Sequence, residues 1–459
     1  MQWQSLKGRL PEFVWPTIPD QAGALTAAML YQLELSQWYS TEIVTEMQLL
    51  QAQVLVRHAI DSSPYYQQQF RSVLAGAMCS SLEQWRKSPI LSRENLLKRQ
   101  AELLSQRNLI SHGEVFEKET SGSTGAQLKI ADTDAANLLW LAITMREHHW
   151  HQRDFSGRLM VIRSGRYEKD PIAVRHSPDW GAPVSYMYNT GQSTLLFHTM
   201  PIFQQAELLL DIKPQYLIAY PSNILRLAQF FRANSLKLDG LLGLITYGEL
   251  MLPEVRQDAF DVWGVPIADI YSCEEVGYIA LQCPQSGNYH CQSESVIVEV
   301  LDDSGNQCGP GQIGRIVLTS LHNFAMPLIR YENGDYAEVG ESCPCGRGGL
   351  TLARVLGRGR NRAVGKEGKK FWPNVSRKIW SVIDGIEELQ LVQQSAEQID
   401  VKIVRSHAMD AAQEKILADA LRNALEQPYS FSFSYHKDIA RQLNGKYERF
   451  LRTYDSSGG

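Results

Sequence analysis

The most distinctive stretch of the chain is Thr120-Ser121-Gly122-Ser123-Thr124-Gly125, with Lys129 four residues further on. Successive small residues let a backbone approach a ligand closely, and hydroxyl and amide donors suit phosphate oxygens. A Walker-type phosphate loop is excluded because no Gly-Lys-Ser/Thr triplet follows at the required spacing. Two interpretations therefore remain, a phosphate-binding loop and a Ser/Gly-rich surface turn.

The sequence that follows this stretch alternates between strand-like and helical patterns. Strands are expected at 159–163, 216–219, 242–246, 267–270, 296–301 and 314–319. Helical patterns between several of these runs favour an α/β fold. Residues 296–340 predict a β-rich meander, because their strand-like runs are divided by turn sequences at 302–306 and 310–311.

The sequence that precedes it is mainly helical. Apolar residues at helical spacing predict one or two helices over 20–60, ending near residues 61–64. Further short helices are expected over 80–110, with Ser92 at the start of one of them.

A basic, glycine-rich stretch divides the chain unequally. It begins with Gly357-Arg358-Gly359-Arg360-Asn361-Arg362, continues to Lys370, and is the best linker candidate. Helical patterns at 374–385 and 410–427 and alternating runs at 388–393 and 399–404 follow it. We therefore predict a large α/β amino-terminal domain with several subdomains over 1–355, a hinge and basic loop over 356–370, and a small mobile α+β domain over 371–459.

The composition excludes several classes of protein. With 44% hydrophobic residues the 459-residue chain can bury enough apolar surface to fold, and its net charge of −5 gives no signature of nucleic-acid binding. No apolar run approaches the roughly eighteen residues of a membrane span, and the first residues lack a secretory pattern. The odd number of cysteines, seven, argues against a disulfide framework. These features predict a cytoplasmic protein of enzyme size with no nucleic-acid or membrane partner.

Five motifs follow one another along the chain in a characteristic order. They are Thr120–Gly125, Tyr271-Ser272-Cys273-Glu274-Glu275, Arg330-Tyr331-Glu332-Asn333-Gly334-Asp335, Gly357-Arg358 and Asn444-Gly445-Lys446. In this order they resemble the adenylate-forming superfamily, which includes acyl-CoA synthetases, firefly luciferase and peptide-synthetase adenylation domains. Three amino-terminal segments resemble its phenylacetate–CoA ligase-like branch, which also includes synthetases that adenylylate a deazaflavin coenzyme: Arg57-His58-Ala59, Ser63-Pro64-Tyr65-Tyr66 and Pro89-Ile90-Leu91-Ser92.

The resemblance implies an activity and a set of site residues. The activity is ATP- and Mg²⁺-dependent conversion of a small carboxylic acid, aryl or arylacetic, to an acyl-adenylate. The implied ATP-binding residues are Thr120, Ser121, Gly122, Ser123, Thr124, Gly125, Gly248, Glu249, Tyr271, Asp335 and Arg358. Glu275 would hold Mg²⁺, since a hard cation prefers carboxylate ligands, and Lys446 would neutralise the reacting carboxylate and α-phosphate. From the residues alone, the alternatives are a solvated Glu275, a β-turn at Asp335 and a solvated Lys446.

The acid pocket and the acceptor are less closely specified. The pocket is expected to draw on residues 185–222, and its candidate residues are Tyr186, Tyr188, Tyr220, Ser222 and Tyr247. CoA or a carrier thiol is the expected acceptor in a second, thioester-forming step. Two departures from the family pattern bear on the mechanism: Ser272 stands where the family has glycine, and Arg360 stands at the position of the hinge aspartate. Arg360 makes adenylation the firmer expectation of the two steps.

Two short clusters supply a candidate metal site. Its ligands are Cys283, His290, Cys343 and Cys345, a set of three thiols and one imidazole that suits tetrahedral zinc. Both clusters border predicted turns of the β-rich region, and the resembled subgroup often carries such a pair. The expectation is a closed, structural zinc site. The alternatives are unpaired cysteines in turns, and Cys291 as a competing ligand.

A second histidine-rich stretch, His148-His149-Trp150-His151, is interpreted as a packed helix end, because adjacent histidines on a helix point in different directions. Two other functions stay open for the chain as a whole. One is transfer of AMP to a hydroxyl of a coenzyme or metabolite with no thiol step. The other is catalytically silent nucleotide binding.

Overall fold

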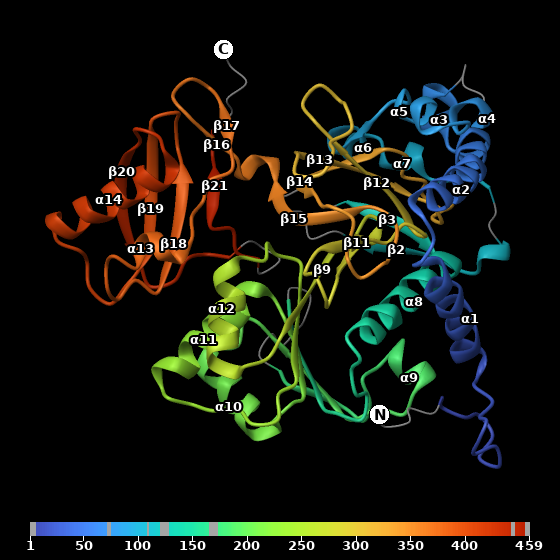
Figure 1. Ribbon diagram of the computed structural model, residues 1–459, viewed down its shortest axis with the longest axis horizontal. Coiled ribbons are helices and arrows are strands. Elements are labelled where there is room, and N and C mark those ends of the chain that lie inside the picture. Colours follow the sequence, from blue (N-terminus) through green and yellow to red (C-terminus); the bar gives the residue numbers. More distant parts are fainter. Residues whose placement is uncertain are drawn as a thin grey trace.

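The structure is a computed structural model that describes residues 6–70, 75–107, 110–119, 128–164, 173–441 and 446–454. A large body built on one long sheet carries a small carboxy-terminal domain beside it, drawn in orange and red in Figure 1. Among the described residues, thirteen strands join in the long sheet and four in the sheet of the small domain. This arrangement confirms the predicted α/β architecture with a separate second domain.

One half of the long sheet is parallel. Its strands, in order, are β9 (Ile267–Cys273), β8 (Gly243–Tyr247), β7 (Tyr216–Ala219), β4 (Leu159–Arg163) and β6 (Ser193–Phe197), with β5 (Arg175–Ser177) antiparallel at the edge. Successive side chains of β4 point to opposite faces of the sheet. Met160 packs in the hydrophobic core on one face, and Leu159 packs in the core on the other face. Because both faces are apolar, helices cover both.

The helices on the two faces come from different parts of the chain. The Met160 face packs against α10 (Ile202–Ile212), α11 (Pro221–Ala233) and α12 (Pro253–Trp263). The Leu159 face packs against α1 (Gln21–Ser36), α8 (Asp134–Trp150) and α9 (Val184–Met187). Figure 1 shows these two groups on opposite sides of the strands.

The other half of the long sheet is antiparallel, and it includes the β-rich meander predicted over 296–340. It continues from β9 through β10 (Gly277–Gln282), β11 (Tyr289–Cys291), β15 (Thr351–Arg358), β14 (Tyr331–Val339), β13 (Ile313–Ser320) and β12 (Val296–Leu301). The turn between β12 and β13 forms where expected: the Asp302 carboxylate accepts the amides of Ser304 and Asn306 at 2.9 and 2.8 Å, and Gly305 has φ +85°. This half of the sheet contributes to both candidate sites described below.

The amino-terminal region is helical, as predicted. After α1 come α2 (Thr41–Ser62), α3 (Pro64–Gln69), α4 (Ala75–Met78), α5 (Leu82–Arg86), α6 (Arg93–Lys98) and α7 (Gln100–Leu103), and later a 3-10 turn (Ile110–His112) and a hairpin of β2 (Val115–Glu119) and β3 (Lys129–Thr133). Ser92 caps α6 by accepting the amide of Asn95 at 3.2 Å. The two-residue strand β1 (Leu91–Ser92) pairs with β14 in parallel, so α6 begins beside the long sheet.

The small domain has a sheet in the order β20 (Ser430–His436), β19 (Gln398–Val404), β18 (Glu388–Gln393) and β21 (Phe450–Arg452). Helix α14 (Ala411–Leu425), the single turn α13 (Arg377–Trp380) and a hairpin of β16 (Ala363–Val364) and β17 (Lys370–Phe371) accompany it. Its core begins early in the chain, since Ala363 is fully buried within it. The helix predicted over 374–385 is only the single turn α13. The strands predicted at 388–393 and 399–404 and the helix predicted over 410–427 are β18, β19 and α14.

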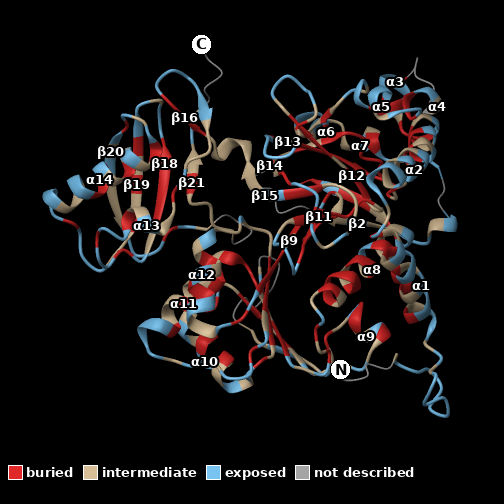
Figure 2. Ribbon diagram, in the orientation of Figure 1, coloured by how far each residue is buried: buried red, intermediate tan, exposed pale blue. Residues whose placement is uncertain are grey.

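The glycine-rich stretch differs from its prediction as a linker. Gly357 and Arg358 are the last residues of β15 and pair with Tyr336 and Asp335 of β14, and a 3-10 turn (Gly359–Asn361) follows. Ladder hydrogen bonds to β14 override the flexibility that glycine and arginine suggest. Figure 2 shows buried residues on the strands of both domains and on the helices that pack against them, such as α8, α11 and α12. None of the helices in the described ranges combines the length and apolar character needed to cross a bilayer.

Candidate active site and metal cluster

A cavity of about 710 Å³ lies between the large body and the small domain. Both domains line it, and it brings together eight of the residues singled out from the sequence: Ser222, Gly248, Glu249, Tyr271, Glu275, Asp335, Arg358 and Lys446. Most of these side chains stand at or just beyond the carboxyl ends of β8 and β9 or on the facing strands β14 and β15. This is the edge where parallel α/β sheets ordinarily bind ligands.

One wall of the cavity is a buried hydrogen-bond cluster around Asp335. The Tyr271 hydroxyl donates to Asp335 Oδ2 at 2.9 Å, and the Asn333 amide donates to both the same oxygen and the Tyr271 hydroxyl at 2.9 and 3.0 Å. Arg358 Nε lies 3.1 Å from Asp335 Oδ1. Burial, and then the adjacent Asp335 carboxylate, raises the pKa of Tyr271, so its phenol stays a donor. The carboxylate is thus fixed in orientation before any ligand arrives.

Glu275 lies on the same side of the cavity and is only 6% exposed. Arg93 Nη1 donates to Glu275 Oε1 at 2.6 Å, and the Tyr331 hydroxyl donates to the same oxygen at 3.2 Å. Burial alone would raise the pKa of Glu275, but the charge and hydrogen bond of Arg93 outweigh it and hold that pKa below its ordinary value. Glu275 is therefore an ionised, oriented carboxylate at the cavity.

Lys446 reaches the cavity from the small domain. A Cβ atom added to Gly248, which has φ +76°, would lie 3.4 Å from Lys446 Cε and 3.5 Å from its Nζ, so the ammonium packs against this glycine backbone. The next residue, Tyr447, donates its amide to Glu249 Oε1 at 2.8 Å. Glu249 also accepts the amide and hydroxyl of Ser222 at 2.9 and 3.0 Å. The lysine and the loop after β8 are thus joined across the domain boundary.

The five acid-pocket candidates separate into two groups. Ser222 lines the cavity, and Tyr220 and Tyr247 form a tilted ring pair with centroids 5.1 Å apart beside Gly248. Tyr186 and Tyr188 lie instead at α9, outside the cavity lining. The Tyr188 hydroxyl is 3.3 Å from His149 Nε2, so this side chain packs toward α8. The structure does not bring this second group to the cavity.

Part of the sequence prediction falls outside the described residues. The motif Thr120-Ser121-Gly122-Ser123-Thr124-Gly125 lies there, as do Asn444 and Gly445 next to Lys446. Their proposed contacts with phosphate stay predictions. The described flanks place β2 and β3 on either side of the first motif.

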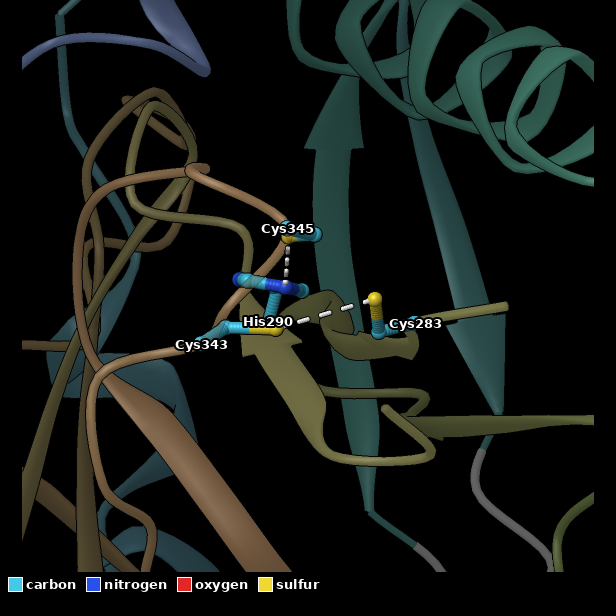
Figure 3. A group of neighbouring side chains, drawn as sticks. All are labelled: Cys283, His290, Cys343 and Cys345. Carbon is cyan, nitrogen blue, oxygen red and sulfur yellow. Dashed lines mark hydrogen bonds between the residues drawn. The ribbon is translucent and has the colours of Figure 1, made fainter. Parts of the chain in front are cut away.

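The four candidate metal ligands meet in the antiparallel half of the sheet. Figure 3 shows Cys343 and Cys345 on one loop facing Cys283, which directly follows β10, and His290 of β11. Their ligand atoms all lie within 4.8 Å of one another, with Cys283 Sγ to Cys343 Sγ at 3.7 Å and Cys345 Sγ to His290 Nε2 at 3.3 Å. Ligand sulfurs of tetrahedral zinc, with Zn–S bonds of about 2.3 Å, are about 3.8 Å apart. The spacing and donor set therefore fit zinc.

The surroundings of the cluster also suit a metal. Burial, then Arg347 and Arg146, lowers the pKa of His290 to about 4, which keeps the imidazole neutral. Although burial disfavours the thiolate, hydrogen bonds from the amides and hydroxyl of the 285–286 turn lower the pKa of Cys283 to about 7. All seven cysteines are free thiols, and Cys291 lies outside the cluster.

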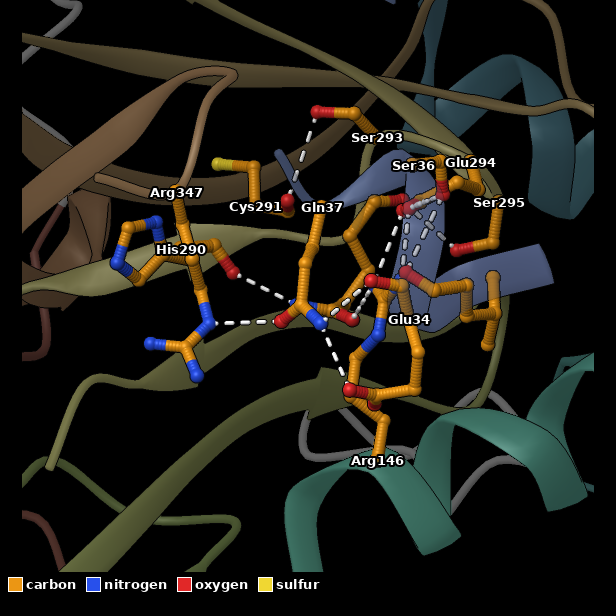
Figure 4. Close-up of polar contacts among 12 residues, drawn as sticks. Glu34, Ser36, Gln37, Arg146, His290, Cys291, Ser293, Glu294, Ser295 and Arg347 are labelled. Carbon is orange, nitrogen blue, oxygen red and sulfur yellow. Dashed lines mark hydrogen bonds and ion pairs between the residues drawn. The ribbon is translucent and has the colours of Figure 1, made fainter. Parts of the chain in front are cut away.

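The loop that carries Cys343 and Cys345 is fastened to the end of α1. Arg347 Nε donates to Gln37 Oε1 at 2.8 Å, and Trp150 Nε1 donates to the same oxygen at 2.9 Å. Next to them, Arg146 pairs with Glu294 at 2.8 Å. Figure 4 shows this network linking α1, α8 and the meander. The metal cluster thus lies at a junction of three parts of the large body.

The histidine-rich end of α8 forms no second cluster of this kind among the described residues. His148 Nδ1 accepts from Arg153 Nη1 at 2.8 Å, His149 faces Tyr188, and His151 Nε2 lies 3.2 Å from the carbonyl of Gln282. Burial, followed by the Arg153 charge, lowers the pKa of His148 to about 3. These side chains point apart, as the helical spacing implied.

Three residues around the cavity were missed by the sequence analysis. Arg93 follows directly after the Pro89–Ser92 segment, and Tyr331 and Asn333 lie within the quoted Arg330–Asp335 motif. Their position inside or next to a motif was the available signal. Pairing of Arg93 with Glu275 could not be inferred, because 182 residues separate them.

Comparison with known proteins supports the resemblance. Residues 364–452 match the CapK C-terminal domain family. A phenylacetate-coenzyme A ligase of Thermus thermophilus is 30% identical over 162 residues, 34% of this chain and 36% of that protein. Protein CapK of Staphylococcus aureus is 22% identical over 235 residues, half of each chain. The matched regions therefore span about a third to a half of these relatives.

Solved structures extend the likeness to the whole fold. A 2-hydroxyisobutyryl-CoA ligase in its postadenylation state matches with a TM-score of 0.70 at 19% identity, over 88% of this chain and 89% of that one. The same ligase in its thioesterification state, in complex with an AMP adduct and CoA, matches with a TM-score of 0.57 at 20% identity, over 89% of each chain. The chain is therefore a homologue of proteins named phenylacetate-coenzyme A ligase and CapK, with the fold of an acyl-CoA ligase of the adenylate-forming superfamily.

Proposed function

We propose that this protein is an adenylate-forming ligase that uses ATP to activate a carboxylic acid. The observation that carries the proposal is the cavity in which Asp335, Glu275 and Lys446 meet from two domains. A fixed carboxylate, a second ionised carboxylate and an ammonium match the needs of ribose, metal and phosphate respectively. The homologues named acid–CoA ligases support the same activity.

Nucleotide binding is assigned to the Asp335 cluster. Its carboxylate, already held by Tyr271, Asn333 and Arg358, accepts hydrogen bonds from the two ribose hydroxyls. Because the carboxylate is already oriented in the folded protein, nucleotide binding loses little further side-chain entropy. Gly248 and Glu249, which line the cavity, are assigned to the adenine, and the Thr120–Gly125 motif, outside the described residues, stays the predicted phosphate-binding segment.

The chemical step joins the acid to the nucleotide. An oxygen of the substrate carboxylate attacks the α-phosphorus of ATP, the bond from that phosphorus to the bridging oxygen breaks, and pyrophosphate leaves with the bond electrons. Lys446 places positive charge between the approaching carboxylate and the α-phosphate, two groups that otherwise repel. Closure of the small domain excludes water, which would hydrolyse the acyl-adenylate.

Two metals have assigned positions in this proposal. Glu275, whose carboxylate is ionised at the cavity, would hold Mg²⁺, and the bound ion would supply positive charge to neutralise the phosphates. The Cys283, His290, Cys343 and Cys345 cluster would hold Zn²⁺, because it supplies the four protein ligands that a structural zinc site needs. The zinc is structural, since the cluster residues are not among those that line the cavity.

The substrate class and the second step follow the family resemblance. The acid is aryl or arylacetic, with Tyr220, Tyr247 and Ser222 the pocket residues at or beside the cavity. CoA then receives the acyl group: its thiolate attacks the acyl carbon, and AMP leaves with the electrons of the carbon–oxygen bond.

The decisive test is ATP–pyrophosphate exchange with a panel of aryl, arylacetic and amino acids, each with and without CoA. Exchange that depends on one class of acid, with thioester formed only when CoA is present, is the expected result. A stable AMP–substrate product without CoA dependence would replace the proposal with AMP transfer to a metabolite. ATP binding without exchange for any acid would leave a silent nucleotide-binding protein.

A further inference from the structure

Each of the three residues that follow Lys446 is held by a group from another segment of the chain. The Tyr447 amide donates to Glu249, the Glu448 carboxylate binds Arg360, and the Arg449 guanidinium binds Glu254 of α12. Glu249 and Glu254 belong to the large body, and Arg360 to the turn after β15. The short segment next to the lysine is thus fastened at three successive positions.

The Arg360 contact joins this segment to the turn after β15. Arg360 Nη2 lies 3.0 and 3.2 Å from the two carboxylate oxygens of Glu448, and the side chains are 30% and 15% exposed. Gln390 Nε2 donates to the Glu448 carbonyl at 2.7 Å, so both the backbone and the side chain of Glu448 are held. Because the pair is only partly exposed, solvent and salt screen it less than a fully exposed surface pair.

The position of the segment decides where the ammonium lies. Lys446 packs against Gly248, where there is no side chain, with Nζ 3.5 Å from the place a Cβ would occupy. A displacement of about 1 Å in such a contact is enough to cost a large part of a positioning effect. Glu448 is two residues from Lys446 along the chain, so its contacts with Arg360 and Gln390 limit how far the segment that carries the lysine can shift.

We propose that Arg360 is a positioning residue, which seats Lys446 at the cavity by binding Glu448. Arginine suits this role because its guanidinium stays charged, and here its Nη2 reaches both oxygens of the Glu448 carboxylate. The inference rests on the proposed function for its catalytic consequence, but the seating itself is a property of the folded chain. It gives a function to the arginine that departs from the family pattern at the hinge.

The test compares charge reversal with charge exchange in the full-length protein. The variants are Arg360→Glu, Glu448→Arg, the double variant Arg360→Glu/Glu448→Arg, and Arg360→Lys as a conservative replacement. Lys366→Glu is the matched control, because it makes the same charge change in the same basic stretch at an exposed pair, Lys366 with Glu397 at 3.8 Å. Hydrogen–deuterium exchange of peptides covering 446–454 measures seating without any substrate.

The expected pattern has two parts. Arg360→Glu speeds exchange of the 446–454 amides at least about 10-fold and lowers kcat of pyrophosphate exchange at least about 10-fold, with KM for ATP within about threefold. The double variant and Arg360→Lys each recover at least half of the change in amide exchange rate and in kcat, measured on a logarithmic scale. Lys366→Glu changes neither the amide exchange rate nor kcat.

Unchanged amide exchange in Arg360→Glu, or no recovery in the double variant, would overturn the inference. A fall in KM for ATP or in thermal stability with unaltered kcat would also overturn it, since that marks a merely structural pair. If the parent protein catalyses no pyrophosphate exchange with any acid, the proposed function fails, and the amide-exchange comparison still decides whether Arg360 seats the segment.

Discussion

The phenol of Tyr271 donates a 2.9 Å hydrogen bond to the carboxylate of Asp335, although the two residues are 64 positions apart in the chain. The bond joins β9 of the parallel half of the sheet to β14 of the antiparallel half. Arg358 on β15 supplies the counter-charge of the Asp335 carboxylate, and the two contacts together fix the orientation of that carboxylate at the cavity. A site built in this way is sensitive to the loss of a single charge.

Asp335→Asn is therefore expected to weaken ATP binding. The change keeps the shape of the side chain but removes the charge-assisted acceptor and the partner of Arg358, so Kd for ATP should rise about 10- to 100-fold. Isothermal titration calorimetry with ATP measures this. Asp303→Asn, at a side chain that is 79% exposed, is the control and should bind as the parent does. Equal ATP affinity in Asp335→Asn and the parent would refute the assigned role.

Lys446→Ala is expected to separate chemistry from binding. Removing the ammonium should lower the rate of pyrophosphate exchange by about 100-fold or more and leave Kd for ATP within about threefold, because its charge acts mainly on the developing transition state. Steady-state exchange and calorimetry give the two numbers. Lys415→Ala, at an exposed lysine of α14, is the matched control. Exchange rates that are the same in Lys446→Ala and the parent would remove Lys446 from the mechanism.

The metal cluster predicts about one zinc ion per chain by inductively coupled plasma mass spectrometry. Cys345→Ala should lose most of this zinc and lower the midpoint of thermal unfolding by about 5 °C or more, since the ion joins two loops of the large body. Cys308→Ala, at a buried cysteine outside the cluster, should keep its zinc. Parent protein that is folded and contains no near-stoichiometric zinc would contradict the assignment.

His148 predicts a specific loss of stability in mild acid. Its pKa is lowered to about 3 in the folded protein and returns to its ordinary value near 6.5 on unfolding. Between these two pH values the His148 imidazole is protonated in the unfolded chain and neutral in the folded chain. The contribution is fully present above pH 6.5 and is lost as the pH falls toward 3. His148→Asn, which keeps an acceptor for Arg153, should flatten this slope by up to about 1.4 kcal/mol per pH unit.

Urea unfolding at a series of pH values measures the slope. The exposed His407 gives the control variant His407→Asn, which should follow the parent. A slope that is identical in His148→Asn and the parent between pH 6 and pH 4 would show that His148 is not the source.

Much of the fold could be predicted because hydrophobic period and turn chemistry act locally. The strand expected at 242–246 is β8 at 243–247, and the Asp302–Asn306 turn forms from its own side chains. The strand at 357–358 was not predicted, because it depends on pairing with β14, which the residues of the stretch alone do not indicate. Local signals thus succeeded where the stabilising partner lies close in sequence.

The same distinction applies to the candidate site. Motifs made it possible to name Asp335, Glu275 and Lys446 from the sequence. The aromatic residues at 185–222 lie in no motif, and only the amino-acid composition of that segment pointed to them. Composition does not give direction, and Tyr188 packs toward His149 and away from the cavity. The role of Arg93 could not be predicted from its own segment, because Arg93 approaches Glu275 only when β1 pairs with β14 in the folded chain.

That two-residue pairing has a practical consequence for dividing the protein. The helices before residue 98 look like an accessory layer on the long sheet, yet they deliver the cation that orients Glu275. A shortened chain that begins at α8 would retain the parallel strands, the small domain and every quoted motif after residue 134. It would nevertheless leave a buried carboxylate without its counter-charge, so swaps of the amino-terminal region between relatives must carry the Arg93–Glu275 pair together.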